Sequence, residues 1–319
     1  MAADVAARPG QAARRGPGQR GPAQRRPTPA DLIGLSPATA LFGLFIIVPM
    51  LGAVVLSFFR WNGLGTPHWA GVSNWAQFFG DPVAGQSLVV TAKVIGLSWV
   101  VQTPISMALG LFIAGRQRYR TVYATIYVLP LLLSTAGIAL VWEGMLDPNF
   151  GAVTALSRSL HLGFLQQNWL GSAHLTLYVV VAIIAWQFIP FHTLLYQVGR
   201  RQIPGVLYEA ATLDGASGFA LFWRVTLPQL RYTMVTSSTL MIVGALTYFD
   251  IIYILTDGGP GYTSRVLSLD MYHEAFLQNQ FGYASVLAVV LGVAGLAIAL
   301  GLARATGFTA MGSQQEGAT

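Results

Sequence analysis

The chain has 319 residues, of which 54% are hydrophobic and only 9% charged, and its formal net charge at pH 7 is +6. An ordinary soluble domain carries roughly a quarter charged residues, so this composition excludes a water-soluble globule and favours a membrane protein. The sequence contains no cysteine, which excludes disulfides, thiolate metal sites and a cysteine nucleophile.

The first 30 residues consist mainly of Ala, Arg, Gly, Pro and Gln, with Val5 as the only branched aliphatic residue. Such a segment buries too little apolar surface to offset the entropy of ordering it, so residues 1–30 are predicted to form a disordered basic tail. The tail could bind nucleic acid or anionic lipid, but a solvated tail that helps to orient the protein is the simpler interpretation. No nucleic-acid partner is expected.

Six apolar runs follow, each of about the length that crosses a bilayer core. They cover residues 38–59, 88–114, 123–142, 175–198, 234–255 and 283–302. The predicted fold class is therefore an all-α polytopic membrane protein with six transmembrane helices. Its transmembrane domain is expected over residues 31–308, and a short C-terminal tail over residues 309–319.

The basic residues predict which side of the membrane each connection faces. Fourteen of the 18 Lys and Arg residues precede the first run, follow the last, or lie between runs two and three or four and five. Basic residues accumulate on the cytoplasmic side, so both termini are predicted to be cytoplasmic. The net charge is therefore explained by topology. The heavy use of Ala, Gly and Arg with a single Lys is typical of a high-GC bacterial genome, so the chain is expected in the cytoplasmic membrane of a bacterium.

The connection over residues 256–282 contains a glycine-rich stretch from Asp257 to Gly261. This stretch could cradle a phosphate, but such a site needs a helix N-terminus directly after it. The sequence continues instead into a mixed loop, which favours a tight turn.

Several catalytic sites are excluded or disfavoured. The single lysine, Lys93, lies between Ala92 and Val94, which excludes a Walker A loop and ATP hydrolysis by that route. The five histidines lack zinc-site spacing, so no metal site is predicted. Residues 215–218 spell the GxSG pattern of rhomboid-type intramembrane proteases, but Ser217 lies outside the predicted spans, and His192 is the only histidine inside one.

Polar side chains inside the spans are candidates for a substrate pathway. Asp250 and His192 are the most exceptional of them, and Asp250 is the best candidate, because an Asp near a helix centre is expected to face a cavity, a partner or water. The further candidates are Gln187, Tyr248 and Tyr253. Hydrogen bonding between helices remains the alternative for each of these residues, as it does for Gln102 and Thr103.

The cytoplasmic connection from Arg201 to Arg231 is predicted to be structured. Pro204 can begin one short helix, a turn is expected at Asp214 and Gly215, and residues 216–225 can form a second helix that ends before Pro228. Ala210, Ala211, Gly215 and Ala216 would give a small-residue surface that another protein can approach closely.

These residues resemble the EAA motif of the permease subunits of binding-protein-dependent ABC importers. The match consists of Glu209, Ala210, Ala211, Gly215, Val225, Leu227 and Pro228, with Val225 where the motif commonly has Ile. Residues 249–260 and 281–284 are similar to the carbohydrate-uptake branch of this family, which includes maltose and glycerol-phosphate permeases.

The resemblance implies a non-catalytic subunit of an ATP-driven sugar importer that works by alternating access. Its partners would be a second, similar permease chain, two cytoplasmic ATPases and an external sugar-binding protein. No cofactor is expected on this chain, because ATP and Mg would be bound by the ATPases. The residues implied in coupling to an ATPase are Glu209, Ala210, Ala211, Asp214, Gly215, Leu227 and Pro228.

Two other functions remain open at this point. A stand-alone secondary carrier or channel would depend on an ion gradient and not on ATPases, and an intramembrane protease would depend on Ser217. The sequence does not indicate which sugar is moved, or whether this subunit or its partner holds the main sugar contacts.

Overall fold

The computed structural model describes residues 29–115 and 118–305, so the predicted terminal tails lie almost wholly outside the described residues. Helices make up most of the described chain. Its strands are two short segments, β1 (Phe59–Arg60) and β2 (His68–Trp69), which pair antiparallel with Phe59 opposite Trp69.

The chain divides into two compact units, Met1–Met50 and Leu51–Thr319. The described part of the first unit contains α1 (Pro29–Phe42), the π-helical turn η1 (Gly43–Ile47) and the start of α2 (Val48–Leu56). An apolar stretch suitable for crossing a membrane runs over Gly34–Leu56. It confirms the first predicted span, which the sequence placed at residues 38–59.

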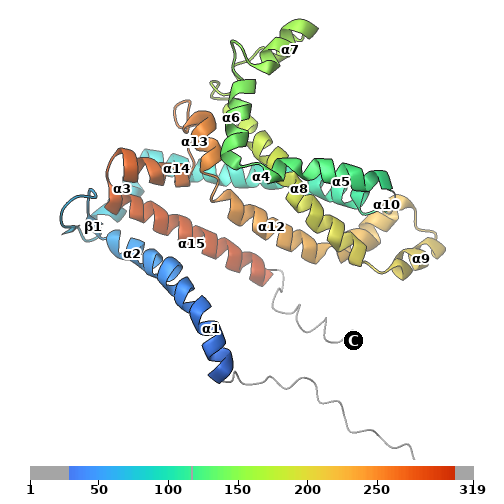
Figure 1. Ribbon diagram of the computed structural model, residues 1–319, viewed down its shortest axis with the longest axis horizontal. Coiled ribbons are helices and arrows are strands. Elements are labelled where there is room, and N and C mark those ends of the chain that lie inside the picture. Colours follow the sequence, from blue (N-terminus) through green and yellow to red (C-terminus); the bar gives the residue numbers. More distant parts are fainter. Residues whose placement is uncertain (1–28, 116–117, 306–319) are drawn as a thin grey trace, which may run out of the picture. The chain divides into compact units, whose positions relative to one another are not determined.

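The second unit contains the remaining helices, shown in Figure 1. Their bounds are α3 Ser73–Gly80, α4 Pro82–Ile113, α5 Arg118–Leu132, α6 Thr135–Met145, α7 Ala152–Leu160, η2 Gly163–Leu165, α8 Thr176–Gln202, α9 Gly205–Leu213, α10 Gly218–Leu221, η3 Phe222–Thr226, α11 Leu227–Gln229, α12 Arg231–Ala245, α13 Asp250–Thr256, α14 Leu267–Tyr272, η4 His273–Leu277 and α15 Phe281–Ala305.

Four described helices are long and apolar enough to cross a membrane by themselves, and two bent helix pairs bring the number to six if each pair counts as one span. This result confirms the predicted all-α polytopic class. Two spans differ from their predicted form, because α5 and α6 meet at 98° and α12 and α13 at 49°. Pro130 lies near the first bend, where Ser134 begins α6 by accepting a hydrogen bond from the backbone N–H of Gly137 (3.1 Å).

The longest helix, α4, buries many of its polar side chains. Its buried face carries Ser87, Thr91, Ser98, Gln102, Thr103 and Ser106, whereas Val100, Ile105 and Phe112 are exposed. Lipid favours this arrangement because it solvates apolar groups only, so polar groups turn toward other helices. At Gly110, a side chain would lie 2.6 Å from the Cβ atom of Tyr196, so glycine permits the close approach of α4 and α8.

Candidate functional site

A cavity of about 420 Å³ lies among α5, α6, α8, α12 and α13. Most side chains on its wall are apolar, and a minority are polar. The lining residues are Leu131, Thr135, Phe188, Phe191, His192, Leu240, Met241, Gly244, Thr247, Tyr248, Phe249, Asp250 and Ile251. Each of the two helix bends places an interruption of a helix at the cavity wall. Thr135 begins α6 after the first bend, and Thr247 to Phe249 lie between α12 and α13 at the second.

Tyr248 and Gln187 lie at the cavity in different ways. The buried Tyr248 lines the wall, and its ring stacks on that of Phe188 with 5.4 Å between the centroids. Gln187 is buried one residue layer behind the wall, where its Nε2 donates to Oγ1 of the lining residue Thr135 (3.1 Å). The predicted alternative, hydrogen bonding between helices, therefore holds for Gln187, although its bond positions a cavity residue.

The sequence predicted Asp250 near the centre of a helix, and this placement is wrong. Asp250 is exposed and is the first residue of α13, directly after the break that follows α12. At this position the carboxylate lines the cavity and lies at a helix N-terminus, where the partial positive charge of the backbone N–H groups favours it.

Tyr253 lies outside the lining of this cavity. Its side chain is 38% exposed and stacks on Phe249 with 5.4 Å between the ring centroids. Its other ring neighbour is Tyr272 of α14, at 5.3 Å. The structure thus brings Tyr248 and Asp250 together at the cavity, and Gln187 is linked to it through Thr135. The ring of Phe249 lies between Tyr253 and the cavity.

A set of buried polar atoms runs along the helices beside the cavity. The hydroxyl groups of Ser98 and Thr103 and Oε1 of Gln187 make no hydrogen bond within the described part of the chain. Gln102 lies against the Tyr248 hydroxyl, and Thr193 against that of Tyr127. Burying a polar group without a partner is unfavourable, so a polar strip of this kind is typical of an interior that meets water or a polar solute.

The coupling loop, residues 201–231, forms two short helical arms. The first arm is α9, and the second runs continuously through α10, η3 and α11 from Gly218 to Gln229. The two predicted helices are confirmed, with shifted ends: Pro204 precedes α9 as its N-cap, and Pro228 lies inside α11, so it does not end the second helix.

The turn between the arms is a Schellman motif, in which a left-handed residue ends a helix. The backbone N–H of Ala216 donates to the carbonyl of Ala211 (2.9 Å), and that of Gly215 donates to the carbonyl of Thr212 (3.0 Å). Gly215 has a φ of +80°, which glycine adopts without strain. A Cβ at Gly215 would meet no atom of the described chain within 4 Å, so the constraint that this chain itself places on the position is the backbone conformation.

The coupling loop exposes large apolar side chains. Neither α9 nor α10 contains a buried residue. Leu213 is 89% exposed, and Val206, Phe219 and Trp223 are also exposed. Glu209, Ala210 and Asp214 are exposed beside them, and Ala211 and Leu227 are half-buried. Figure 1 shows this loop at one end of α8, with α13 and α14 toward the other end.

The connection from α13 to α15, residues 257–280, begins with the tight turn that the sequence predicted. Asp257, Gly258 and Gly261 have positive φ angles, and the N–H of Ser264 closes the turn on the carbonyl of Gly258 (3.2 Å). Below it, Nε of Arg265 donates to Oδ1 of the buried Asp270 (2.8 Å).

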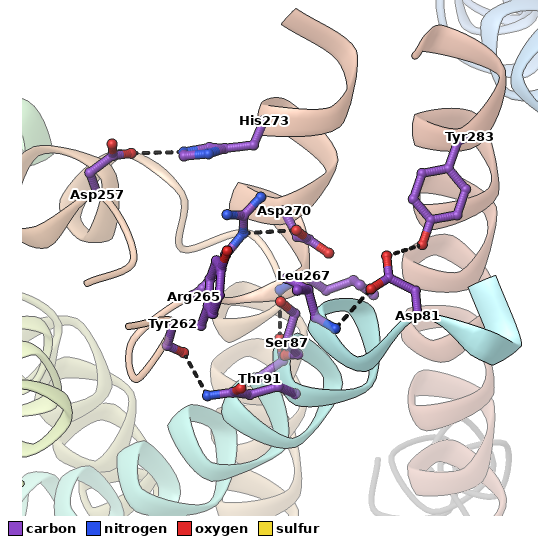
Figure 2. Close-up of polar contacts among 12 residues, drawn as sticks. Asp81, Ser87, Thr91, Asp257, Tyr262, Arg265, Leu267, Asp270, His273 and Tyr283 are labelled. Atoms are coloured by element: carbon purple, nitrogen blue, oxygen red, sulfur yellow. Dashed lines mark hydrogen bonds and ion pairs between the residues drawn. The ribbon is translucent and has the colours of Figure 1, made fainter. Parts of the chain in front are cut away.

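Figure 2 shows the polar contacts in and around this connection. Oγ1 of Thr91 on α4 accepts from the backbone N–H of Leu267 (2.9 Å). The hydroxyl of Tyr283 on α15 donates to Oδ2 of Asp81 (2.7 Å), the residue that caps α4. Burial raises the pKa of Asp270, and the positive charge of Arg265 opposes that rise.

The protease hypothesis finds no support in the geometry of its residues. Nδ1 of the buried His192 lies 2.9 Å from Oγ of Ser237 on α12, which joins α8 to α12. Ser217 instead precedes α10 in the coupling loop. His192 was singled out in the sequence, but its place at the cavity could not be predicted, because that place depends on how α8 packs against its neighbours.

Known proteins resemble this chain over most of its length. A probable ABC transporter permease protein of Pyrococcus horikoshii is 32% identical, and the match covers 85% of this chain and 94% of the relative. A trehalose/maltose transport system permease of Thermococcus litoralis is 31% identical over 77% of this chain and 83% of its own. A chain in the crystal structure of a bacterial alginate ABC transporter, in complex with an alginate pentasaccharide-bound periplasmic protein, is 22% identical with a TM-score of 0.75, covering 85% of this chain and 92% of that one.

Residues 102–306 match the family described as the binding-protein-dependent transport system inner membrane component. The matched region contains the cavity, the coupling loop and the α13–α15 connection. Subunits of this kind do not catalyse ATP hydrolysis themselves. The chain belongs to this family and is a permease subunit of an ABC transporter.

Proposed function

We propose that this chain is the transmembrane subunit of an ATP-driven importer that moves a sugar across the cytoplasmic membrane by alternating access. The sugar assignment is supported by relatives, one of which is named a trehalose/maltose permease. The structural relative belongs to an alginate transporter, and alginate is also a carbohydrate.

The cavity supports a sugar as the transported solute. Its volume of about 420 Å³ falls within the range of roughly 300–1,000 Å³ typical of small-molecule sites. Tyr248 and Phe188 offer aromatic surface, to which the apolar faces of a pyranose ring can bind. Asp250 and Thr135 offer hydrogen-bonding groups for its hydroxyls.

The exposed coupling loop is the observation that carries the ATP-driven part of the proposal. A loop that leaves Leu213 almost fully exposed and places Glu209 beside it has the character of a surface covered by another protein. The Schellman turn at Gly215 holds the two arms at a fixed angle. An ATPase that binds this loop differently with and without ATP would shift the spans between two states.

The proposed assembly contains a second, homologous permease chain, two cytoplasmic ATPases and an external sugar-binding protein. ATP and Mg²⁺ are bound by the ATPases in this proposal, and the permease needs no cofactor of its own. Both termini and the coupling loop face the cytoplasm, in agreement with the distribution of basic residues. The α13–α15 connection then faces outward.

Reconstitution of the complex in proteoliposomes tests the proposal. Uptake of radiolabelled oligosaccharides, maltose and trehalose among them, is measured together with ATP hydrolysis for the wild type, Glu209→Lys and Gly215→Asp. Both variants are expected to lose most uptake, because the first reverses the charge of the docking surface and the second places a side chain at a positive φ. Glu143→Lys, which alters an exposed glutamate on α6, is the matched control.

Co-purification of the ATPase separates the outcomes. Loss of uptake in the two coupling variants, with the chain still inserted and Glu143→Lys active, supports an importer driven through this loop. Uptake that continues without any ATPase contradicts it and favours the secondary carrier.

A further inference from the structure

Tyr208 makes two side-chain contacts that no other residue of α9 makes. The guanidinium carbon of Arg200, in the last turn of α8, lies 4.1 Å from the centroid of the Tyr208 ring. The Tyr208 hydroxyl lies 2.9 Å from Oγ1 of Thr226, at the end of η3. One side chain therefore contacts the end of α8 and both arms of the coupling loop.

The direction of the second contact follows from the bonds of Thr226. The Thr226 hydroxyl is buried and donates its proton to the carbonyl of Leu221 (3.3 Å). It therefore accepts from the Tyr208 hydroxyl. This bond matters because α9 and α10 have no buried residue that could fix the arms by apolar packing.

The end of α8 is itself firmly packed. At Gly199 a Cβ would lie 2.4 Å from Oγ1 of Thr233 and 3.0 Å from the side chain of Leu230, so α8 closely contacts the start of α12. Leu230 is fully buried. A displacement that reaches Arg200 therefore reaches a rigid helix, and about two turns earlier that helix lines the cavity with His192.

We infer that Tyr208 is a positioning residue that transmits movement of the coupling loop to α8, through its ring contact with Arg200 and its hydrogen bond to Thr226. The inference rests on the proposed function, because it names the residue through which the ATPase would act on the cavity. The Schellman turn fixes the arms at their outer end, and Tyr208 fixes them at the end that faces the spans.

The first test measures hydrogen exchange of the backbone amides in the full-length chain in detergent, without partners. Tyr208→Phe keeps the ring over Arg200 and removes the hydroxyl. Amide protection over residues 205–226 is expected to fall several-fold, up to about tenfold, as for the loss of one hydrogen bond. Tyr178→Phe, an exposed tyrosine near the start of α8, is the control and should leave protection unchanged.

A double-mutant cycle assigns the effect to the bond. Thr226→Val should lower protection by the same factor as Tyr208→Phe, and the double variant should fall no further than either single variant. Unchanged protection in Tyr208→Phe, or additive losses in the double variant, would overturn the inference.

The second test uses the reconstituted complex and the sugar that the uptake assay selects. In Tyr208→Phe the sugar transported per ATP hydrolysed is expected to fall by about two- to tenfold, while the ATPase still co-purifies. An unchanged ratio overturns the inference. A wild-type complex that shows no ATP-driven uptake contradicts the proposed function instead, and hydrogen exchange of the chain alone still decides the role of Tyr208.

Discussion

The coupling loop and the α13–α15 connection are of similar length, but they differ in how firmly the rest of the chain packs against them. The coupling loop joins α8 to α12, and the α13–α15 connection joins two helices at the other end of the same unit. In the α13–α15 connection, Leu267, Leu269 and Asp270 are buried, and Thr91 of α4 bonds to its backbone. In the coupling loop, helices α9 and α10 bury nothing.

The difference shows which connection is complete in this chain alone. In residues 257–280, Arg265 pairs with Asp270 inside the connection, and Thr91 of α4 bonds to the backbone of Leu267, so the conformation is set by the permease itself. The coupling loop keeps its shape through a turn and the contacts of Tyr208, and leaves its apolar side chains for another surface.

Breaking the buried ion pair should produce the largest effect on stability. Arg265→Met leaves the carboxylate of Asp270 buried without its partner, and the free energy of unfolding is expected to fall by about 3–5 kcal/mol. Thermal unfolding of the detergent-solubilised chain measures the loss. The double variant Arg265→Met/Asp270→Leu should recover most of it, because the apolar pair leaves no buried charge. A double variant as unstable as the single one would show that the pair is not the cause.

A pair of leucine substitutions sharpens the contrast between the two connections. Leu213→Ala alters an 89% exposed side chain and should change the free energy of unfolding by less than about 0.5 kcal/mol. The same variant should weaken ATPase binding about tenfold, measured by titration of the ATPase onto the reconstituted permease. Leu267→Ala, at a buried leucine, should do the reverse and destabilise the chain by about 2–5 kcal/mol. Equal losses of stability in Leu213→Ala and Leu267→Ala would contradict the proposed difference between the exposed coupling loop and the buried α13–α15 connection.

The smallest expected effect is a pH dependence at Glu274 in η4. Burial raises the pKa of this carboxyl, the negative charges of Asp270 and Asp81 raise it further, and Arg265 opposes them. A carboxyl whose pKa is higher in the folded than in the unfolded state binds its proton more tightly when folded, so stability rises as the pH falls through the folded pKa. The gain is complete below the unfolded pKa.

Unfolding temperatures from about pH 7 to about pH 5 test this sign. The wild type should gain more stability on acidification than Glu274→Gln, and the variant should be the more stable of the two at neutral pH. Glu143→Gln, at an exposed glutamate, serves as the control. A wild type that loses stability relative to Glu274→Gln as the pH falls would contradict the assigned direction.

Features that depend on neighbouring residues could be predicted from the sequence. Apolar runs located the spans, and the spacing from Glu209 to Gly215 located the turn, because the Schellman motif is formed by consecutive residues. The turn at Asp257 to Gly261 was predicted for the same reason.

Features that depend on packing could not be predicted. The run at 123–142 contains Pro130, which tends to kink a helix, but its sequence did not indicate a bend as large as 98°. The run at 234–255 contains no proline, so its bend of 49° gave no signal, and Asp250 was misplaced as a result. Tyr208 gave no signal either, because its hydroxyl bonds to a residue 18 positions away across the turn.

The buried polar side chains of α4 have a consequence for how the chain is made. Helices α8, α12 and α14, which pack against α4, all follow it in the chain and are synthesised after it. Until they are in place, the Ser, Thr and Gln side chains of α4 lack these neighbours, and lipid is a poor substitute for them. A nascent α4 at the membrane therefore needs water or another protein against its polar side chains, and its close approach to α8 at Gly110 can form only once α8 has been made.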